Sequence, residues 1–277
     1  MNINKILVPI DFSPCSINAL KMAIQLAKKT DASLELVNAI HVPHPHVDVV
    51  GAEAVVQPIL ADYEIQVEEH FKNLPEEVPE LKGVEYESKR FVSVVIDAVY
   101  TCLENDDIDL IVMGTHGSHS SLENLVGSIS SEIIRFSKVP TLVVPENITS
   151  LDIDKIGFAA DLKKIEDIEH LGAMKTLAQL FNAEILLFHV TKGKEDAFQN
   201  AAQGLKLTNF LRDTKHSFYT MLEDSVYNAI NDFITKHQLD MLVMYPREHG
   251  ILDRLLHGSI TKKIAVNLKI PLLTVHE

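Results

Sequence analysis

The sequence predicts an α/β protein made of two similar domains in tandem, each a doubly wound, mostly parallel sheet of five strands. Two observations predict this architecture. The chain of 277 residues repeats itself, and each copy alternates short apolar runs with longer stretches of helical spacing. Such alternation favours parallel strands joined by right-handed crossovers. Since the chain is long for one ordinary domain, we expect a first domain at 1–147 and a second at 151–277.

The repeat consists of short segments that match in the same order along the two halves. The matched pairs are KILVPID at 5–11 with KIGFAAD at 155–161, ASLELVNA at 32–39 with AEILLFHV at 183–190, DLIVM at 109–113 with DMLVM at 240–244, Gly127-Ser128 with Gly258-Ser259, and VPTL at 139–142 with IPLL at 270–273. The offset falls from about 150 to 131, so the first copy has roughly 20 extra residues in its middle. This ordered agreement indicates a duplication.

The first copy begins with a predicted strand followed by a capped helix. Apolar runs rich in Val, Ile and Leu predict strands at 5–10, 33–39, 108–113 and 140–144. Ser13 can cap the helix that follows the first run, with Pro14 in its first turn. Its apolar face comprises Ile17, Leu20, Ala23, Ile24 and Ala27.

A further helical face is predicted just before the third of these strands. Its apolar residues are Phe91, Val94, Val95, Ala98, Val99 and Cys102. Three aspartates stand between this face and the strand, Asp106, Asp107 and Asp109, and we interpret them as a solvated turn. The last strands of the two copies, Thr141 to Val144 and Leu272 to Val275, are expected to pair within the chain.

A glycine-containing loop follows the strand DLIVM. Gly114-Thr-His-Gly117 is separated by nine residues from Gly127-Ser128, where a helix is predicted to begin. Glycine lets a ligand approach main-chain N–H groups, and a helix N-terminus favours a phosphate group. In doubly wound sheets ligands bind at the carboxyl ends of the strands. The pattern therefore favours a phosphate-containing ligand over glycines that only shape turns.

The loop matches neither of the common nucleotide-binding patterns, because it has no GxxxxGK and no GxGxxG. It contains no lysine or arginine. A phosphate would be held by backbone dipoles, serine hydroxyls and a Mg²⁺ ion that accompanies the nucleotide. Without a fixed cation on the γ-phosphate, binding or sensing is favoured over fast hydrolysis.

The glycine loop, the opening strand VPIDFSPCS and the ending KVPTLVVP resemble the universal stress protein family over nearly the whole chain, and the duplication is similar to its tandem members. The resemblance implies Rossmann-like domains similar to those of adenine-nucleotide alpha hydrolases, and ATP as ligand of the first domain. By position it implies nucleotide contacts from Pro9, Asp11, Ala39, Met113, Gly114, His116, Gly117, Gly127, Ser128 and Ile129. Family members often have arginine where His116 stands here.

The second copy departs from this pattern at the loop. Tyr245 stands in place of Gly114, and Glu248 in place of Gly117. A phenol blocks close approach and a carboxylate repels phosphate. Asp161 and the Gly258-Ser259 pair are retained. We expect a degenerate nucleotide motif here, and a role as structural partner or as a site for a different small molecule.

The composition excludes several classes of partner and compartment. The net charge is −14, most of it in the first half, so nucleic acid and anionic membrane are not expected as partners. No apolar run reaches the length of a membrane span, no signal peptide is expected, and two cysteines form no disulfide framework. We expect a cytoplasmic protein that pairs its own two domains, with a homodimer as an open possibility.

The leading functional hypothesis is an ATP-binding, nucleotide-dependent regulator in the stress response. A slow ATPase or autophosphorylating enzyme is the first alternative, and Ser128, Ser130 and Ser131 could accept a phosphoryl group. A scaffold or carrier of metal or small molecules is the second. His41, His44 and His46 have spacing that could seat a metal, although a solvated proline-rich loop explains them as well.

Overall fold

The structure is a computed structural model of the chain, and it describes residues 1–40, 52–115, 128–159, 168–191, 197–245 and 269–275. Within these ranges the elements alternate between strands and helices, as expected for two doubly wound domains. No helix in these ranges is both long and apolar enough to cross a membrane.

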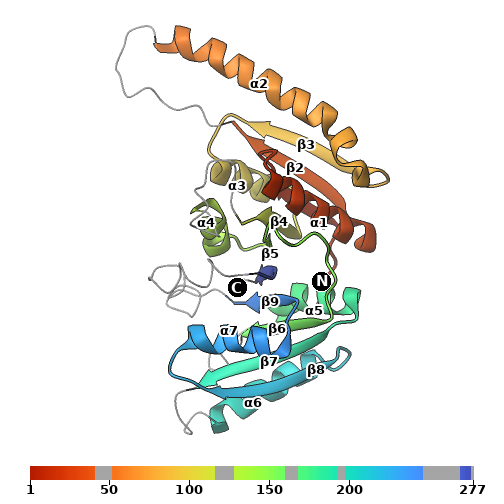
Figure 1. The fold of residues 1–277 in the computed structure, drawn as a ribbon, viewed down its shortest axis with the longest axis vertical. Coiled ribbons are helices and arrows are strands. Elements are labelled where there is room, and N and C mark those ends of the chain that lie inside the picture. Colours follow the sequence, from red (N-terminus) through yellow and green to blue (C-terminus); the bar gives the residue numbers. More distant parts are fainter. Residues whose placement is uncertain (41–51, 116–127, 160–167, 192–196, 246–268, 276–277) are drawn as a thin grey trace.

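All ten described strands join in one sheet, in the order β3-β2-β1-β4-β5-β10-β9-β6-β7-β8 (Figure 1). In the first half they are β1 (Lys5–Pro9), β2 (Ser33–Ala39), β3 (Tyr86–Phe91), β4 (Leu110–Gly114) and β5 (Thr141–Val144). In the second half they are β6 (Lys155–Ala159), β7 (Glu184–Thr191), β8 (His216–Leu222), β9 (Met241–Met244) and β10 (Leu272–Thr274). Each half is parallel throughout, so each domain contributes five parallel strands.

The two halves of the sheet meet at β5 and β10, which pair antiparallel. Leu142 lies opposite Leu273 and Val143 opposite Leu272. Thr274 lies opposite Thr141, and its hydroxyl donates to the Thr141 carbonyl at 3.3 Å. Because these side chains are almost fully buried, the apolar layers on both faces continue from one domain into the other.

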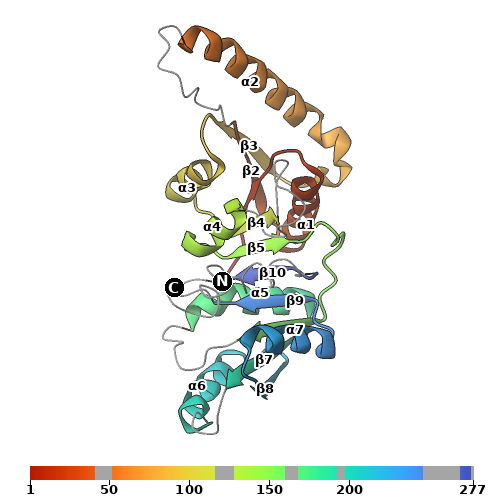
Figure 2. The ribbon, with the colours of Figure 1, turned by 60° about the vertical axis from the view of Figure 1, so that its left-hand side comes forward.

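Helices cover both faces of the sheet (Figures 1 and 2). One face carries α1 (Pro14–Thr30), α2 (Ala52–Glu77), α5 (Gly172–Phe181) and α6 (Ala197–Phe210), with two short 3-10 turns, η1 (Pro79–Leu81) and η2 (Glu169–Leu171). The other carries α3 (Val95–Asn105), α4 (Ser128–Phe136) and α7 (Val226–His237). This arrangement leaves the ends of the parallel strands as the places where loops can form sites.

Two predictions about helix starts have opposite outcomes. The cap of the first helix is confirmed, since the Ser13 hydroxyl accepts a hydrogen bond from the Ser16 N–H at 3.3 Å and Pro14 opens α1. The helical face through Phe91 is wrong at its start. Phe91 ends β3, and α3 begins only at Val95. Strand β3 was not predicted, because its sequence YESKRF alternates with charged side chains on an outer strand of the sheet.

Candidate functional site

The candidate site lies where β2, β1 and β4 end side by side at the carboxyl edge of the first half-sheet. Pro9, Ala39 and Gly114 are the last residues of these three strands, and Met113 is buried just before Gly114. The strands are neighbours because β1 pairs with both of the others. The fold therefore brings together residues that are about 100 positions apart in the sequence.

Asp11 follows β1 and shapes the turn into α1. Its carboxylate accepts a hydrogen bond from the Ser13 N–H at 3.1 Å, and its own N–H donates to the Ser16 hydroxyl at 3.3 Å. The backbone N–H of the N-cap Ser13 and the Ser16 hydroxyl in the first turn of α1 thus hold the Asp11 segment. The side chain is half-buried, so a part of it remains open to solvent or ligand.

Gly114 lies tightly against the first turn of α1. A Cβ at this position would come within 2.6 Å of the Cys15 Sγ and 3.0 Å of the Cys15 carbonyl oxygen. Real Cβ atoms do not come so close to other heavy atoms. The glycine therefore has a structural reason to be here, in addition to any role toward a ligand, because it lets the start of α1 approach the end of β4.

The first turn of α4 is tied to the same strand end. Ser130 is buried, and its hydroxyl lies within hydrogen-bonding distance of two carbonyl oxygens, 3.0 Å from that of Gly114 and 3.2 Å from that of Thr115. Ser130 thus anchors the helix rather than offering a hydroxyl to solvent. Since α1 and α4 both begin beside the end of β4, two helix N-termini with their partial positive charge are directed to one place.

Two residues that the sequence analysis did not single out also shape this edge. Asn38 is buried, and its side-chain N–H donates to the Ile10 carbonyl at 2.8 Å, which links β2 to the segment that precedes Asp11. Phe12 has a φ of 60°, a left-handed conformation that is unusual for an aromatic residue. The conformation of Phe12 depends on tertiary packing, which a local pattern does not reveal.

Helix α2 provides that packing. The Phe12 ring stacks on His70 with centroids 4.7 Å apart, and it meets the edge of Phe71 at 5.1 Å. Aromatic contacts of this geometry stabilise beyond the area that they bury. The turn that carries Asp11 is therefore held from one side by hydrogen bonds at the start of α1 and from the other by rings of α2.

Several predicted site residues fall outside the part of the chain that the structure describes. These are His116, Gly117 and Gly127, as well as His41, His44 and His46 and, in the second copy, Asp161, Glu248, Gly258 and Ser259. Ser128 begins α4, and Ile129 beside it is exposed at 37%. The structure thus brings together Pro9, Asp11, Ala39, Met113, Gly114 and the start of α4.

The same edge of the second domain is built differently. Tyr245 follows β9 in place of Gly114, and its half-buried ring packs against the apolar core. Helix α5 begins at Gly172, whereas the 150-residue offset would place the counterpart of Pro14 near position 164. The tight contact between glycine and helix start in the first domain therefore has no described counterpart in the second.

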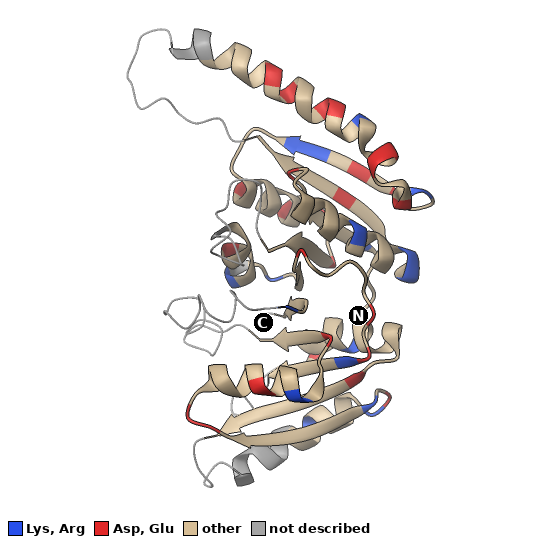
Figure 3. Ribbon diagram, viewed as in Figure 1, with Lys and Arg blue, Asp and Glu red and all other residues tan. Residues whose placement is uncertain are grey.

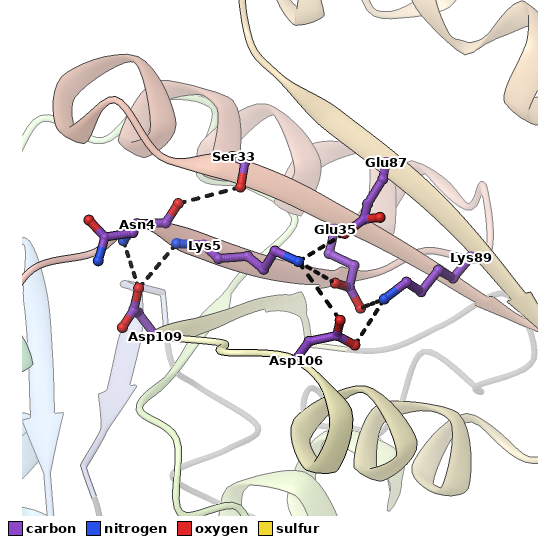
Figure 4. A network of polar contacts seen from close by, with 8 residues as sticks. All are labelled: Asn4, Lys5, Ser33, Glu35, Glu87, Lys89, Asp106 and Asp109. Atoms are coloured by element: carbon purple, nitrogen blue, oxygen red, sulfur yellow. Dashed lines mark hydrogen bonds and ion pairs between the residues drawn. The ribbon is translucent and has the colours of Figure 1, made fainter.

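At the opposite, amino edge of the first domain lies a buried charged network (Figure 4). Glu35 has no exposed surface, and its carboxylate oxygens lie 3.2 Å from the Lys5 Nζ and 3.1 Å from the Lys89 Nζ. Lys5 also binds Glu87 at 2.9 Å, and Lys89 binds Asp106 at 2.9 Å. Two lysines thus compensate the charge of the buried carboxylate, and each of them also pairs with a second carboxylate that is more exposed.

The pKa values of the network follow from these contacts. Hydrogen bonding to Glu87 raises the pKa of Lys5, and the same contact lowers the pKa of Glu87. Burial alone would lower the pKa of Lys89, but its bonds to Asp106 and Glu35 together raise it. Burial, followed by the hydrogen bond to Glu35, raises the pKa of the Cys102 thiol to about 12. Lys5, Lys89 and Glu87 are therefore charged at neutral pH, and the Cys102 thiol is neutral.

Glu35, Cys102 and Asp106 lie close enough together to be considered as metal ligands, with ligand atoms within 4.8 Å of one another. The two carboxylates are already neutralised by Lys5 and Lys89. A thiol must lose its proton to bind a metal, which a pKa of about 12 opposes. The cluster therefore fits an ion-pair network better than a metal site.

The interpretation of the aspartates before β4 as a solvated turn is wrong for two of them. Asp106 binds Lys89, as described above. The Asp109 carboxylate accepts hydrogen bonds from the backbone N–H of Asn4 at 2.7 Å and of Lys5 at 3.1 Å. Asp240 does the same for Asp154 and Lys155, both at 2.9 Å. Both domains thus use this aspartate to attach the start of their first strand.

Comparison with known proteins agrees with this architecture. The model of the universal stress protein family matches the chain twice, at residues 2–145 and 153–276. The chain belongs to the universal stress protein family. Universal stress protein MJ0531 of Methanocaldococcus jannaschii is 29% identical over 141 residues, which are 50% of this chain and 81% of the relative. Universal stress protein A homolog 1 of Coxiella burnetii is 32% identical over 146 residues, which are 52% of this chain and 97% of the relative.

Both curated relatives match about half of this chain, as expected when a single-domain protein is compared with a tandem one. A solved structure of a universal stress protein from Archaeoglobus fulgidus matches the whole length. It covers 100% of this chain and 97% of its own, with a TM-score of 0.74 and 17% identity. This likeness shows the fold, in which two family domains stand in tandem.

Proposed function

We propose that the first domain binds ATP together with Mg²⁺ and that the protein acts as a nucleotide-dependent regulator in the stress response. The observation that supports this most is the convergence of α1 and α4 on the end of β4, where Gly114 lets the start of α1 lie close to the strand. The contact set is Pro9, Asp11, Ala39, Met113, Gly114, His116, Gly117, Gly127, Ser128 and Ile129.

The described part of the site fits a nucleotide with its metal. Asp11 is half-buried at the end of β1 and can accept hydrogen bonds from a nucleoside. Phosphate oxygens and water supply most ligands of Mg²⁺ in nucleotide sites, so the chain need not provide a cage. With no lysine in the loop, binding is favoured over turnover.

We propose the second domain, 151–277, as the structural partner of the ATP-binding domain, 1–147. Tyr245 and Glu248 replace two glycines of the loop, which supports a lost triphosphate site. The pairing of β5 with β10 supports a lasting association of the domains within one chain, and this pairing covers the edge strand of each half. A homodimer would then have to use another surface. Both cysteines are free and buried, which is compatible with a cytoplasmic location.

Calorimetry with MgATP on the full chain tests the proposal. We expect one ATP per chain and an affinity about tenfold lower for Asp11→Ala, because a polar contact of about 1.4 kcal/mol is lost. Asp161→Ala changes the matching residue of the second domain and should leave the affinity unchanged. A phosphate-release assay under the same conditions separates a slow ATPase from a binding protein.

Absence of heat with millimolar MgATP, and of nucleotide in a mass spectrum of the purified protein, would contradict ATP binding. An equal loss of affinity in both aspartate variants would contradict the assignment to the first domain. Binding of Zn²⁺ without ATP would favour a metal carrier instead.

A further inference from the structure

Helix α2 carries an apolar face that the described part of its own domain does not cover. In the C-terminal half of the helix, Phe71 and Leu74 pack into the core beneath it. In the N-terminal half, Ile59 and Tyr63 are 45% and 46% exposed. Residues four positions apart share one side of a helix, so these two side chains form a continuous patch. Figures 1 and 2 show this half of α2 extending beyond β3.

Three further apolar side chains of the same helix extend this face. Val56, Leu60 and Val67 are half-buried and adjoin Ile59 and Tyr63 on the helix surface. None of these five side chains belongs to the apolar cores of the described residues. The exposed apolar face of α2 therefore consists of Val56, Ile59, Leu60, Tyr63 and Val67.

Acidic side chains surround this face. Residues 52–77 contain seven carboxylates and a single basic residue, Lys72. Acidic residues recur along the described part of the helix, as Figure 3 shows. Glu68 is ion-paired with Arg90 of β3 at 2.7 Å, which attaches the helix to the sheet. Asp62, three positions after Ile59, lies along one border of the apolar face, and Glu64, four positions after Leu60, lies along the other.

The matching helix of the second domain differs in its charged residues. This helix, α6, lies at the matching place in the fold and has one lysine and no carboxylate along residues 197–210. The acidic and apolar helix belongs to the segment that makes the first copy longer. It is thus a feature of the first domain and not a requirement of the fold.

The charge of the face decides among possible partners. A second copy of α2 would bring seven further carboxylates against the first seven, and like charges across an interface oppose association. Anionic lipid and nucleic acid are repelled for the same reason. We propose that the exposed apolar face of α2 docks a basic amphipathic helix of a partner protein, whose apolar side covers Ile59 and Tyr63 and whose lysines or arginines meet Asp62 and Glu64. This partner surface goes beyond the proposed ATP binding and does not depend on it.

Fluorescence anisotropy with a model peptide tests the docking surface. The probe is a fluorescein-labelled 18-residue helix of leucine and lysine with leucine at helical spacing, and the control probe has glutamate in place of lysine. The full-length protein is expected to bind the lysine peptide and not the glutamate peptide. Added salt should weaken the complex, because part of the attraction is between charges.

Matched variants locate the binding. Ile59→Ser with Tyr63→Ser should weaken binding about tenfold or more, because both apolar contacts are lost. Ile65→Ser is the control, since Ile65 is 58% exposed and lies on a different side of α2. Asp62→Lys with Glu64→Lys should weaken binding several-fold, whereas Glu104→Lys on α3 should not. Circular dichroism verifies that each variant is folded.

Four outcomes would overturn the proposal. Equal binding of both peptides would show that charge does not select the partner. An Ile65→Ser effect as large as that of the double variant would show that the face is not the site. A dimer in sedimentation experiments that the double variant dissociates would identify a second copy as occupant. Binding to phosphatidylglycerol vesicles that the double variant abolishes would identify a membrane.

Discussion

At the amino ends of the strands, the first domain buries a carboxylate between lysines, whereas the second domain stacks aromatic rings. The first arrangement consists of the buried Glu35 and Cys102 and the half-buried Lys89 and Asp106. By strand register and repeat offset, their counterparts are Leu186, Tyr219, Phe233 and His237. The comparison is informative because the two groups occupy the same place in the same fold within one chain.

The rings of the second domain pack closely against one another. Phe233 stacks on Phe188 at 4.2 Å and on His237 at 4.1 Å between ring centroids. Tyr219 meets the edges of both Phe233 and His237, at 5.2 and 4.7 Å. The Lys155 Nζ, which corresponds to Lys5, donates to the His237 carbonyl at 3.1 Å instead of binding a carboxylate.

The fold therefore requires this volume to be filled, and it accepts either ion pairs or rings. Buried ion pairs often contribute no more to stability than well-packed apolar side chains of similar volume, because desolvation offsets their attraction. Neither arrangement tolerates a substitution that leaves a buried charge without its partner. This conclusion can be tested by moving residues from one domain to the other.

The largest effect is expected from Leu186→Glu. This variant places a carboxylate among rings, where Leu186 is 2% exposed, and it should lower the free energy of unfolding by about 4 kcal/mol. The reverse change, Glu35→Leu, should lower the free energy of unfolding by only about 2 kcal/mol. This loss is smaller because Lys5 and Lys89 keep Glu87 and Asp106 as partners and are partly exposed. Guanidinium denaturation at pH 7.5 measures both.

A fourfold variant sharpens the same comparison. Glu35→Leu, Lys89→Tyr, Cys102→Phe and Asp106→His together recreate the arrangement of the second domain in the first. This variant should be more stable than Glu35→Leu alone. A lower stability would show that the surrounding backbone, and not the side-chain set, distinguishes the two domains.

A smaller effect is expected at the carboxyl edge, where Gly114 contrasts with Tyr245. Gly114→Ala should lower the free energy of unfolding by about 2 kcal/mol, because the new Cβ would meet the Sγ and carbonyl of Cys15. Gly204→Ala in α6 is the control. Its Cβ meets nothing within 4 Å, so this variant should stabilise the protein by up to about 1 kcal/mol. Thermal unfolding of both variants shows whether Gly114→Ala lowers stability while Gly204→Ala raises it.

The smallest expected effect is a pH dependence of stability that arises at His237, in the aromatic group of the second domain. Burial, followed by the charges of Lys236 and Lys155, lowers the pKa of His237 below its usual value of 6.5. The unfolded chain then binds the proton more readily than the folded chain. Stability from this group is thus present above pH 6.5 and is lost as the pH falls through the lower, folded pKa.

His237→Phe should retain the ring stack and remove this contribution. The difference in unfolding midpoint between pH 7.5 and 5.5 is expected to be smaller in His237→Phe than in the parent protein. An unchanged difference would show that His237 is solvated enough to keep its ordinary pKa.

The elements of the first domain differ in how well they could be predicted from sequence. Strands β1, β2, β4 and β5 follow from continuous apolar runs, and the start of α1 follows from Ser13 and Pro14. Strand β3 escaped prediction because its pattern of burial, with charged residues between half-buried ones, is that of an edge. The match between DLIVM and DMLVM located the aspartates Asp109 and Asp240, but not the backbone N–H groups that they bind.

Much of the architecture could be read directly from the chain. The repeat determined that there are two domains, and the apolar runs determined parallel strands, because the burial of both faces leaves a local signature in composition. The glycine spacing and Asp11 placed a phosphate-binding hypothesis at one edge of the first domain. Membership of the universal stress protein family follows from the same residues.

Only the tertiary structure decided which distant residues meet. It placed Glu35 between Lys5 and Lys89, turned Phe12 onto His70 and Phe71, and left Ile59 and Tyr63 exposed on a helix that overhangs the sheet. The physical reason is that ion pairing, ring stacking and exposure depend on what approaches a side chain through space. Local pattern records only whether a side chain is apolar or polar, and not which partner will compensate it.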